Sequence, residues 1–184
     1  MMNKHKIYQL PLLLLCLTLT LSAQVLGMSE QPKDKTSDKI VRFIAVGDTG
    51  TGETGQYQVA NAIEKVCASR GCDFALGLGD NIYEAGVESV EDVQWLEKFE
   101  RPYQNLDFPF YMTLGNHDNS YFSGGGLTNK KGEFQVDYHY QENRQSNKWN
   151  MPARYYHFSA PLKAKRPLVD FFSLDSNPLA GLSD

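Results

Sequence analysis

The 184-residue chain has a composition typical of a globular protein, with 41% hydrophobic and 22% charged residues, and its length suits one domain. The formal net charge of −4 argues against binding of nucleic acid or of an anionic membrane surface by bulk charge. A site for an anion in this chain would therefore need a local cation.

Residues 1–27 have the layout of a secretory signal peptide. Lys4 and Lys6 give a basic start, an apolar run covers 10–21, and small residues follow in 22–27. Because the apolar run is short for a membrane span, we expect cleavage and no stable membrane insertion afterwards. This predicts a secreted or periplasmic location, and an uncleaved anchor is the alternative.

The segments that follow predict a lead-in, a strand and a helix. Residues 28–39 are polar and charged, which is typical of a flexible lead-in. The apolar segment 40–46 predicts a strand buried on both faces, and a glycine-rich loop covers 47–55. The helix from Gln56 ends at Gly71, with an inward face made by Tyr57, Ala60, Ile63 and Cys67.

Cys67 and Cys72 are the two cysteines outside the predicted signal peptide. In an oxidising compartment they can form a disulfide across this short separation. The alternative is a pair of free thiols packed at the end of the helix.

Two further strands and one helix complete an alternating order. Strands are predicted at 74–79 and 108–115, each buried. Between them, Ser89 and Asp92 resemble a capping box that opens a helix with Val93, Leu96, Phe99 and Tyr103 facing inward. The order strand, helix, strand, helix, strand predicts an α/β fold with parallel strands.

The remaining sequence is less regular. Residues 130–150 are polar and aromatic without a clear period, and we expect them to run over the surface. The segments 154–160 and 168–175 alternate or are apolar, which predicts two closing strands.

Each of the first three predicted strands ends in a glycine followed by an oxygen-bearing side chain: Asp48, Asp80 and Asn116. Because functional groups of a parallel sheet gather at the carboxyl ends of its strands, we expect these side chains to converge. Two adjacent carboxylates repel unless a proton or a cation lies between them. Hard oxygen ligands of this kind favour hard or borderline metal ions.

Two other interpretations of these loops are weaker. The spacing of Gly47 and Gly52 resembles a phosphate-binding P-loop, but Glu53 stands where that loop has lysine and places a negative charge near the phosphate. Aspartates that follow glycines are also common in turns. Ordinary turns, however, do not explain why three consecutive strands end in a glycine and an oxygen-bearing side chain.

The motifs GD-x-G, GDN-x-Y and GNHD together resemble the calcineurin-like metallophosphoesterases, and specifically the purple acid phosphatases of the tartrate-resistant type. The resemblance begins near Val41 and extends to the C-terminus, and it includes KWNMPARYYHF. It implies a metallophosphoesterase-like β-sandwich flanked by helices. Residues 40–184 would be the N-terminal part of that domain, the first half with βαβαβ order.

The resemblance also implies a dinuclear metal centre. Ordinary members carry histidine in the first motif where this chain has Gly50, and the purple branch uses a tyrosine instead, here Tyr83. By resemblance, Asp48 and Tyr83 bind ferric iron and Asp80 bridges the two metals. Asn116 binds a divalent second metal, which is zinc, iron or manganese.

Further roles follow from the same resemblance. His117 contacts the substrate phosphate or its leaving group, Asp118 orients His117 by a hydrogen bond, and Asn81 lines the substrate pocket. The alternative for His117 is a buried histidine that bonds to a backbone carbonyl. The resemblance assigns no ligand role to His139 or His157.

The implied activity is acid phosphatase chemistry, the hydrolysis of a small phosphate monoester or a phosphoprotein by a metal-bound hydroxide. The family's three further histidine ligands lie in V-x-x-H and G-H-x-H motifs of its second half. G-H-x-H does not occur in this sequence, and the V-x-x-H spacing occurs only at Val136–His139, within the part that resembles the first half. We therefore expect the 184 residues alone to bind metal poorly and to be inactive. The alternatives are a nucleotidase or phosphodiesterase of the same superfamily, and a non-catalytic secreted binding module.

Overall fold

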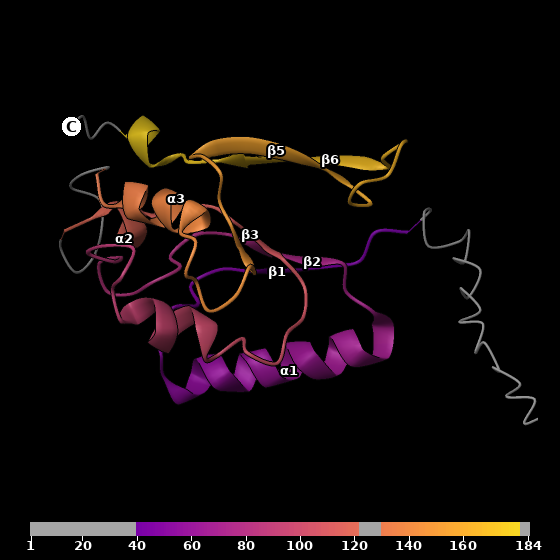
Figure 1. Ribbon diagram of the computed structural model, residues 1–184, viewed down its shortest axis with the longest axis horizontal. Coiled ribbons are helices and arrows are strands. Elements are labelled where there is room, and N and C mark those ends of the chain that lie inside the picture. The colour runs from indigo at the N-terminus through magenta and orange to yellow at the C-terminus, as the bar shows by residue number, and fades with distance from the viewer. Residues whose placement is uncertain (1–39, 122–129, 181–184) are drawn as a thin grey trace, which may run out of the picture. The chain divides into compact units, whose positions relative to one another are not determined.

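The computed structural model describes residues 40–121 and 130–180 (Figure 1). The predicted signal peptide and the predicted lead-in both lie outside these residues. The elements in chain order are β1 (Phe43–Val46), α1 (Thr54–Arg70), β2 (Phe74–Gly77), η2 (Leu96–Glu100), β3 (Phe110–Met112), α2 (Asn116–Asn119), α3 (Gly132–Tyr140), β4 (Trp149–Asn150), β5 (Tyr155–Ala160), β6 (Val169–Leu174) and η3 (Asn177–Ala180). Among the described residues, no helix combines the length and the apolar character needed to cross a membrane.

The first sheet has four parallel strands in the order β1-β2-β3-β4. Phe43 of β1 lies opposite Phe74 of β2, and Phe110 of β3 lies opposite Trp149 of β4. β5 and β6 form a separate antiparallel pair, which we call the ribbon. In Figure 1, α1 lies along one face of the four-stranded sheet and the ribbon lies along the other. The α/β class and the parallel pairing are confirmed.

The first strand is shorter and more exposed than predicted. It starts at Phe43, which is 44% exposed, and Ala45 is exposed as well. The expectation of burial on both faces is wrong because β1 is the outermost strand of the sheet order. Hydrophobicity at every position therefore did not distinguish an edge strand from a central one.

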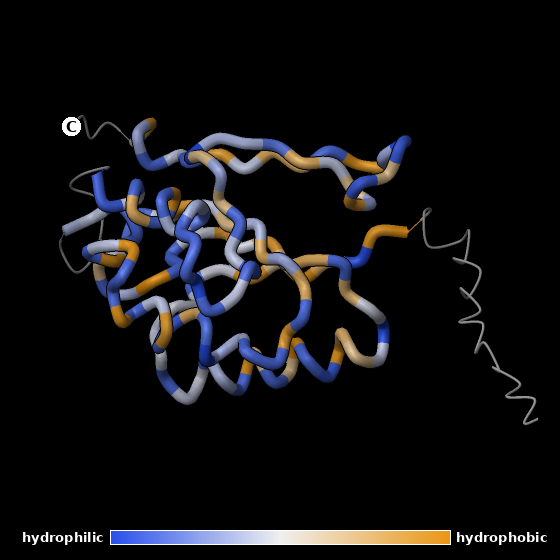
Figure 2. The backbone as a smooth tube through the Cα atoms, viewed as in Figure 1, coloured by the Kyte–Doolittle hydropathy of each residue, from blue (hydrophilic) through white to orange (hydrophobic). Residues whose placement is uncertain are grey.

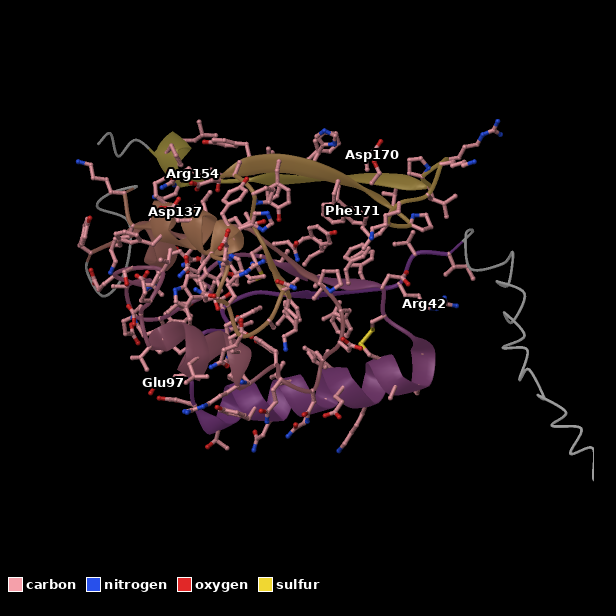
Figure 3. The ribbon with its side chains drawn as sticks, viewed as in Figure 1. Arg42, Glu97, Asp137, Arg154, Asp170 and Phe171 are labelled. Atoms are coloured by element: carbon pink, nitrogen blue, oxygen red, sulfur yellow. A yellow bond between two sulfur atoms is a disulfide. The ribbon has the colours of Figure 1, made fainter. Side chains whose placement is uncertain are left out.

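The helix α1 agrees closely with its prediction. Ala60 and Ile63 are buried in the core, and the N–H of Gly71 donates to the carbonyl of Cys67 at 2.8 Å, which ends the helix. Cys67 and Cys72 form a disulfide with Cα atoms 5.1 Å apart. The predicted pairing is confirmed, and it ties the end of α1 to the start of β2 (Figure 3).

The second predicted helix is a short π-helix, η2. The N–H of Arg101 donates to the carbonyl of Leu96, five residues earlier, so the turn is wider than in an α-helix. Val93, just before this turn, is 59% exposed, and Trp95 is buried in the core instead. The predicted inward position of Val93 is wrong, whereas Phe99 and Tyr103 are buried as expected.

The segment 130–150 is not a surface excursion. It contains α3 and the fourth strand, β4, and it buries Gln135, Tyr138 and Trp149. The Trp95 and Tyr138 rings stack with centroids 3.7 Å apart. The polar residues of this segment obscured its contribution to the core.

The ribbon has two contrasting faces. Its inner face packs on the four-stranded sheet through Phe158 and Phe171, whose rings lie 5.3 Å from that of Phe74. Figure 3 shows Phe171 directed toward that sheet and Asp170 directed away from it. The outward-facing Phe172 and Leu174 are 71% and 63% exposed. Figure 2 shows the resulting alternation of hydrophobic and hydrophilic positions along the ribbon.

Candidate functional site

The loops that leave β1, β2 and β3 meet at the carboxyl edge of the sheet. We call them the first, second and third exit loops, and they cover residues 47–53, 78–86 and 113–119. The first and second are joined by backbone hydrogen bonds, from Thr49 N–H to the Asp80 carbonyl at 3.1 Å and from Tyr83 N–H to the Gly50 carbonyl at 2.9 Å. The convergence predicted from the sequence is therefore built into the backbone.

Gly50 is required by this close approach. A Cβ atom at position 50 would lie 1.8 Å from the carbonyl oxygen of Asn81, far inside van der Waals contact. The absence of a histidine at this position thus has a steric cause, because no side chain fits between the two loops.

Asp48, Asp80 and Tyr83 form one cluster of oxygen atoms. The Tyr83 hydroxyl lies 2.7 Å from Oδ1 of Asp48 and 3.0 Å from Oδ2 of Asp80. Burial raises the pKa of the Tyr83 phenol, and the two carboxylates that accept its hydrogen bonds raise it further. Asp48 also borders a pocket of about 280 Å³.

Both aspartates have an unusual backbone. Asp48 has φ of 55° and Asp80 has φ of 51°, in the left-handed region that few residues other than glycine adopt. The same conformation at the same place after two neighbouring strands directs both carboxylates toward Tyr83. Such backbone outliers cluster at functional sites.

The third exit loop joins this cluster through Asp80. The N–H of His117 donates to Oδ1 of Asp80 at 3.0 Å, and a Cβ atom on Gly115 would lie 2.2 Å from that same oxygen. Asn116 stands between these two residues in the chain and is exposed. The structure therefore brings the backbone on both sides of Asn116 beside Asp80, whereas the predicted convergence of the Asn116 side chain stays a prediction.

The ring of His117 lies against Tyr83, with centroids 4.6 Å apart. Its Nδ1 is 2.6 Å from the carbonyl oxygen of Glu84. Because a carbonyl oxygen only accepts, Nδ1 carries the hydrogen and Nε2 is left for another partner. The bond to a backbone carbonyl is the one that the alternative interpretation of His117 anticipated, although the ring is only partly buried.

Asp118 does not orient His117, so the predicted hydrogen bond between their side chains is wrong. Its carboxylate is fully buried and accepts from the N–H groups of Asn81, Ile82 and Gly115 at 2.9–3.1 Å. Burial raises the pKa of Asp118 to about 6, although these N–H donors act in the opposite direction. Asp118 binds the second exit loop to the third.

Asn81 also differs from its prediction as a substrate-contacting residue. Its side chain is 3% exposed, and Nδ2 donates to the Thr113 carbonyl at 2.8 Å and to Oε1 of Gln135 at 3.1 Å. These bonds turn the amide into the protein, where it holds the loops instead of facing a ligand.

Two residues that support the site escaped the sequence analysis. Gln135 of α3 donates from Nε2 to Oδ1 of Asp118 at 2.7 Å. Lys98 of η2 donates from Nζ to the carbonyl of Tyr83. Neither residue belongs to a motif. The only signal in the sequence was that each is a polar residue in a segment whose other residues contribute to the core.

The remaining histidines lie elsewhere. His139 contacts the Trp149 carbonyl through Nδ1 at 3.4 Å, and His157 stacks on Phe172 at the outer face of the ribbon.

The donor set fits a hard metal ion in part. Within residues 40–121 and 130–180, no three histidine, cysteine, aspartate or glutamate side chains are grouped as a metal site. The cluster instead offers two carboxylates and one phenol, whose hydroxyl lies within hydrogen-bonding distance of both carboxylates. A cation between them would take the place of the phenol proton and offset the repulsion of the carboxylates.

Comparison with known proteins gives this arrangement a context. The family model for calcineurin-like phosphoesterases matches residues 41–176. Tartrate-resistant acid phosphatase type 5 of Sus scrofa is 32% identical over 79% of this chain and 42% of its own length, and the Homo sapiens protein is 32% identical over 78% and 43%. Purple acid phosphatase 4 of Arabidopsis thaliana is 33% identical over 58% of this chain and 31% of its own length. The chain therefore spans less than half the length of these relatives.

A solved structure supports the fold. GAP50, described as the anchor in the inner membrane complex of Plasmodium, matches with a TM-score of 0.53 and 21% identity over 72% of this chain and 39% of its own. Because the family model covers residues 41–176, more than half of the chain, the chain belongs to the calcineurin-like phosphoesterase family.

Proposed function

We propose that the exit loops form half of a dinuclear metal centre that hydrolyses phosphate monoesters. Asp48 and Tyr83 would hold ferric iron, Asp80 would be shared between the two metals, and Asn116 would bind a divalent zinc, iron or manganese ion. The observation that carries this proposal is the Tyr83 hydroxyl, which lies within 3.0 Å of carboxylates from two separate loops. A phenolate and carboxylates are hard ligands that suit such ions.

The bound metals would supply Lewis acidity, which neutralises the phosphoryl oxygens and makes water nucleophilic in mild acid. The contribution of His117 follows from its hydrogen bond. With Nδ1 bound to the Glu84 carbonyl, Nε2 of the protonated ring is the nitrogen that can donate to the phosphate or to the leaving oxygen. Small monoesters and phosphoproteins are the substrates that we propose.

We further propose that the 184 residues alone bind metal weakly and do not turn over substrate. The four implied ligands named above are present, whereas the second-half motifs of the three implied histidine ligands have no counterpart: G-H-x-H is absent, and the one V-x-x-H spacing, at Val136–His139, lies in the first half. The proposed setting is a secreted or periplasmic one, because residues 1–27 have the layout of a signal peptide.

The metal site is tested on the full chain by titration with Fe³⁺ followed by visible absorption. We expect a weak tyrosine–iron band that disappears in Tyr83→Phe. Tyr155→Phe is the matched control, because Tyr155 is exposed on the ribbon and lies outside the cluster. A band that survives in Tyr83→Phe would exclude Tyr83 as the iron ligand and with it the purple type of site.

The catalytic assignment is tested in a chimera in which residues 41–176 replace the aligned part of the Sus scrofa relative. We expect hydrolysis of p-nitrophenyl phosphate that Asp80→Asn reduces by at least about 100-fold, since shared metal ligands are central to this chemistry. A folded chimera whose activity does not depend on Asp80 would count against the proposal. Turnover by the 184-residue chain alone would overturn the expectation that it is inactive.

A further inference from the structure

Asp118 is the point at which two exit loops meet. Its Oδ1 accepts from the N–H groups of Asn81 and Ile82, and its Oδ2 accepts from the N–H of Gly115 at 2.9 Å. The first two N–H groups belong to the second exit loop and the third belongs to the loop that carries Asn116 and His117. One carboxylate thus sets the distance between the loops that bear the proposed ligands.

Gln135 holds this carboxylate from the protein side. Its side chain is fully buried, and it donates from Nε2 to Oδ1 of Asp118 at 2.7 Å while its Oε1 accepts from Nδ2 of Asn81 at 3.1 Å. An amide can donate and accept at the same time, which a carboxylate or an apolar side chain of the same size cannot do.

The position of Gln135 is itself fixed by the core. Its backbone carbonyl accepts from the indole N–H of Trp149 at 3.0 Å, and Trp149 is fully buried in β4. Because buried polar groups are costly when unpaired, the network of Gln135, Asn81 and Asp118 allows one arrangement of the two loops.

We propose that Gln135 is a positioning residue for the candidate metal centre. Through Asp118 and Asn81 it sets the register of the second exit loop against the third, and it thereby places Asp80 and Tyr83 against Asn116 and His117. Its meaning for catalysis rests on the proposed function, but the register itself exists without metal.

The test compares Gln135→Met with Tyr138→Phe in the full chain. Tyr138 lies one turn further along α3, is equally buried, and donates a hydrogen bond to Glu100 at 3.0 Å that lies outside the exit loops. The variants are compared by amide hydrogen exchange, by NMR contacts between the Tyr83 and His117 rings, and by the visible band after addition of Fe³⁺.

We expect Gln135→Met to raise exchange at the N–H groups of Asn81, Ile82 and Gly115 by about tenfold or more, because the Asp118 carboxylate loses a donor that fixes it. We also expect it to weaken the contact between the Tyr83 and His117 rings and to lose the iron band. Tyr138→Phe should leave all three readouts as in the unsubstituted chain, even if both variants lose similar stability.

Equal behaviour of the two variants in exchange and ring contact would overturn the proposal. If Gln135→Met does not fold, Gln135→Glu keeps the size and the acceptor but removes the donor, and the same expectations and the same contrary result apply. A missing iron band in the unsubstituted chain would count against the proposed function alone. An unchanged ring contact together with a normal iron band in the Gln135 variants would count against the positioning role alone.

Discussion

The exit loops and the outer face of the ribbon place their side chains in opposite environments. Polar groups are buried at the loops, whereas apolar groups are exposed on the ribbon. Asp118 in the third exit loop and its partner Gln135 in α3 are both fully buried, and their side chains are hydrogen-bonded to each other. On the ribbon, the apolar Phe172 and Leu174 are 71% and 63% exposed. The loop geometry is therefore determined by contacts within the chain, whereas the outer face of the ribbon contributes little to the stability of what is described here.

The most disruptive change on the loop side is Gly50→Ala. Its new Cβ atom would meet the backbone of Asn81, which cannot move aside as a flexible side chain can, so we expect a loss of about 4 kcal/mol or more in the free energy of unfolding. Gly55→Ala is the control, because no atom lies within 4 Å of the added Cβ atom in α1. It should be neutral or stabilising by up to about 1 kcal/mol. Chemical denaturation measures both, and equal effects would contradict the close approach of the first two loops.

Asp118→Ala is expected to be nearly as severe. It leaves the N–H groups of Asn81, Ile82 and Gly115 buried without their acceptor, which corresponds to about 3–5 kcal/mol. Asp137→Ala, on the exposed side of α3, serves as the control and should change stability by less than about 0.5 kcal/mol. Thermal unfolding monitored by circular dichroism compares the two. A mild effect of Asp118→Ala would mean that the loops are held together by other contacts.

The two faces of the ribbon are compared directly by Phe171→Ala and Phe172→Ala. Phe171 packs on Phe74 and Phe43 at ring distances of 5.3 Å, and its loss should lower the free energy of unfolding by about 2–3 kcal/mol. Its neighbour Phe172 faces outward, and its removal should change stability by less than about 0.5 kcal/mol. Urea unfolding midpoints measure the difference. Equal losses would show that the outer face is packed in solution.

The smallest expected effect concerns the disulfide, which lies at the other end of β2 from the site. Replacing Cys67 and Cys72 together by serine opens a short loop, for which the chain-entropy model gives about 2 kcal/mol. The NMR contacts between the Tyr83 and His117 rings should remain, because the loop network does not involve either cysteine. Loss of those contacts would mean that the site depends on the anchoring of α1.

Local patterns predicted much of this fold correctly. The helix α1 was defined by its inward apolar spacing and by Gly71, and the parallel order followed from alternating elements. The edge position of β1 could not be derived in the same way, since it depends on which strands pair and not on residue type. Trp95 is buried and Val93 is exposed because Trp95 packs on the rings of Tyr138 and Trp149, a contact that depends on the fold and not on the local pattern.

For the candidate site too, some features could be predicted from the sequence and others could not. The meeting of the loops that carry Asp48 and Asp80 was predictable because short motifs after neighbouring strands must meet at one edge of a parallel sheet, and Tyr83 was implied by the family resemblance. The roles of Asp118 and Asn81 were not, because a motif names residue types but does not say which way a side chain turns. Gln135 lies 54 residues from Asn81 in the sequence, and only the fold brings the two side chains together.

The left-handed backbone at Asp48 and Asp80 has a consequence for engineering. Glycine adopts that conformation without steric penalty, so substitution of either aspartate by glycine relieves local strain and removes one of two neighbouring negative charges. Selection for thermal stability alone would therefore tend to replace these aspartates. A mutant library designed to stabilise this fold should leave both positions unchanged.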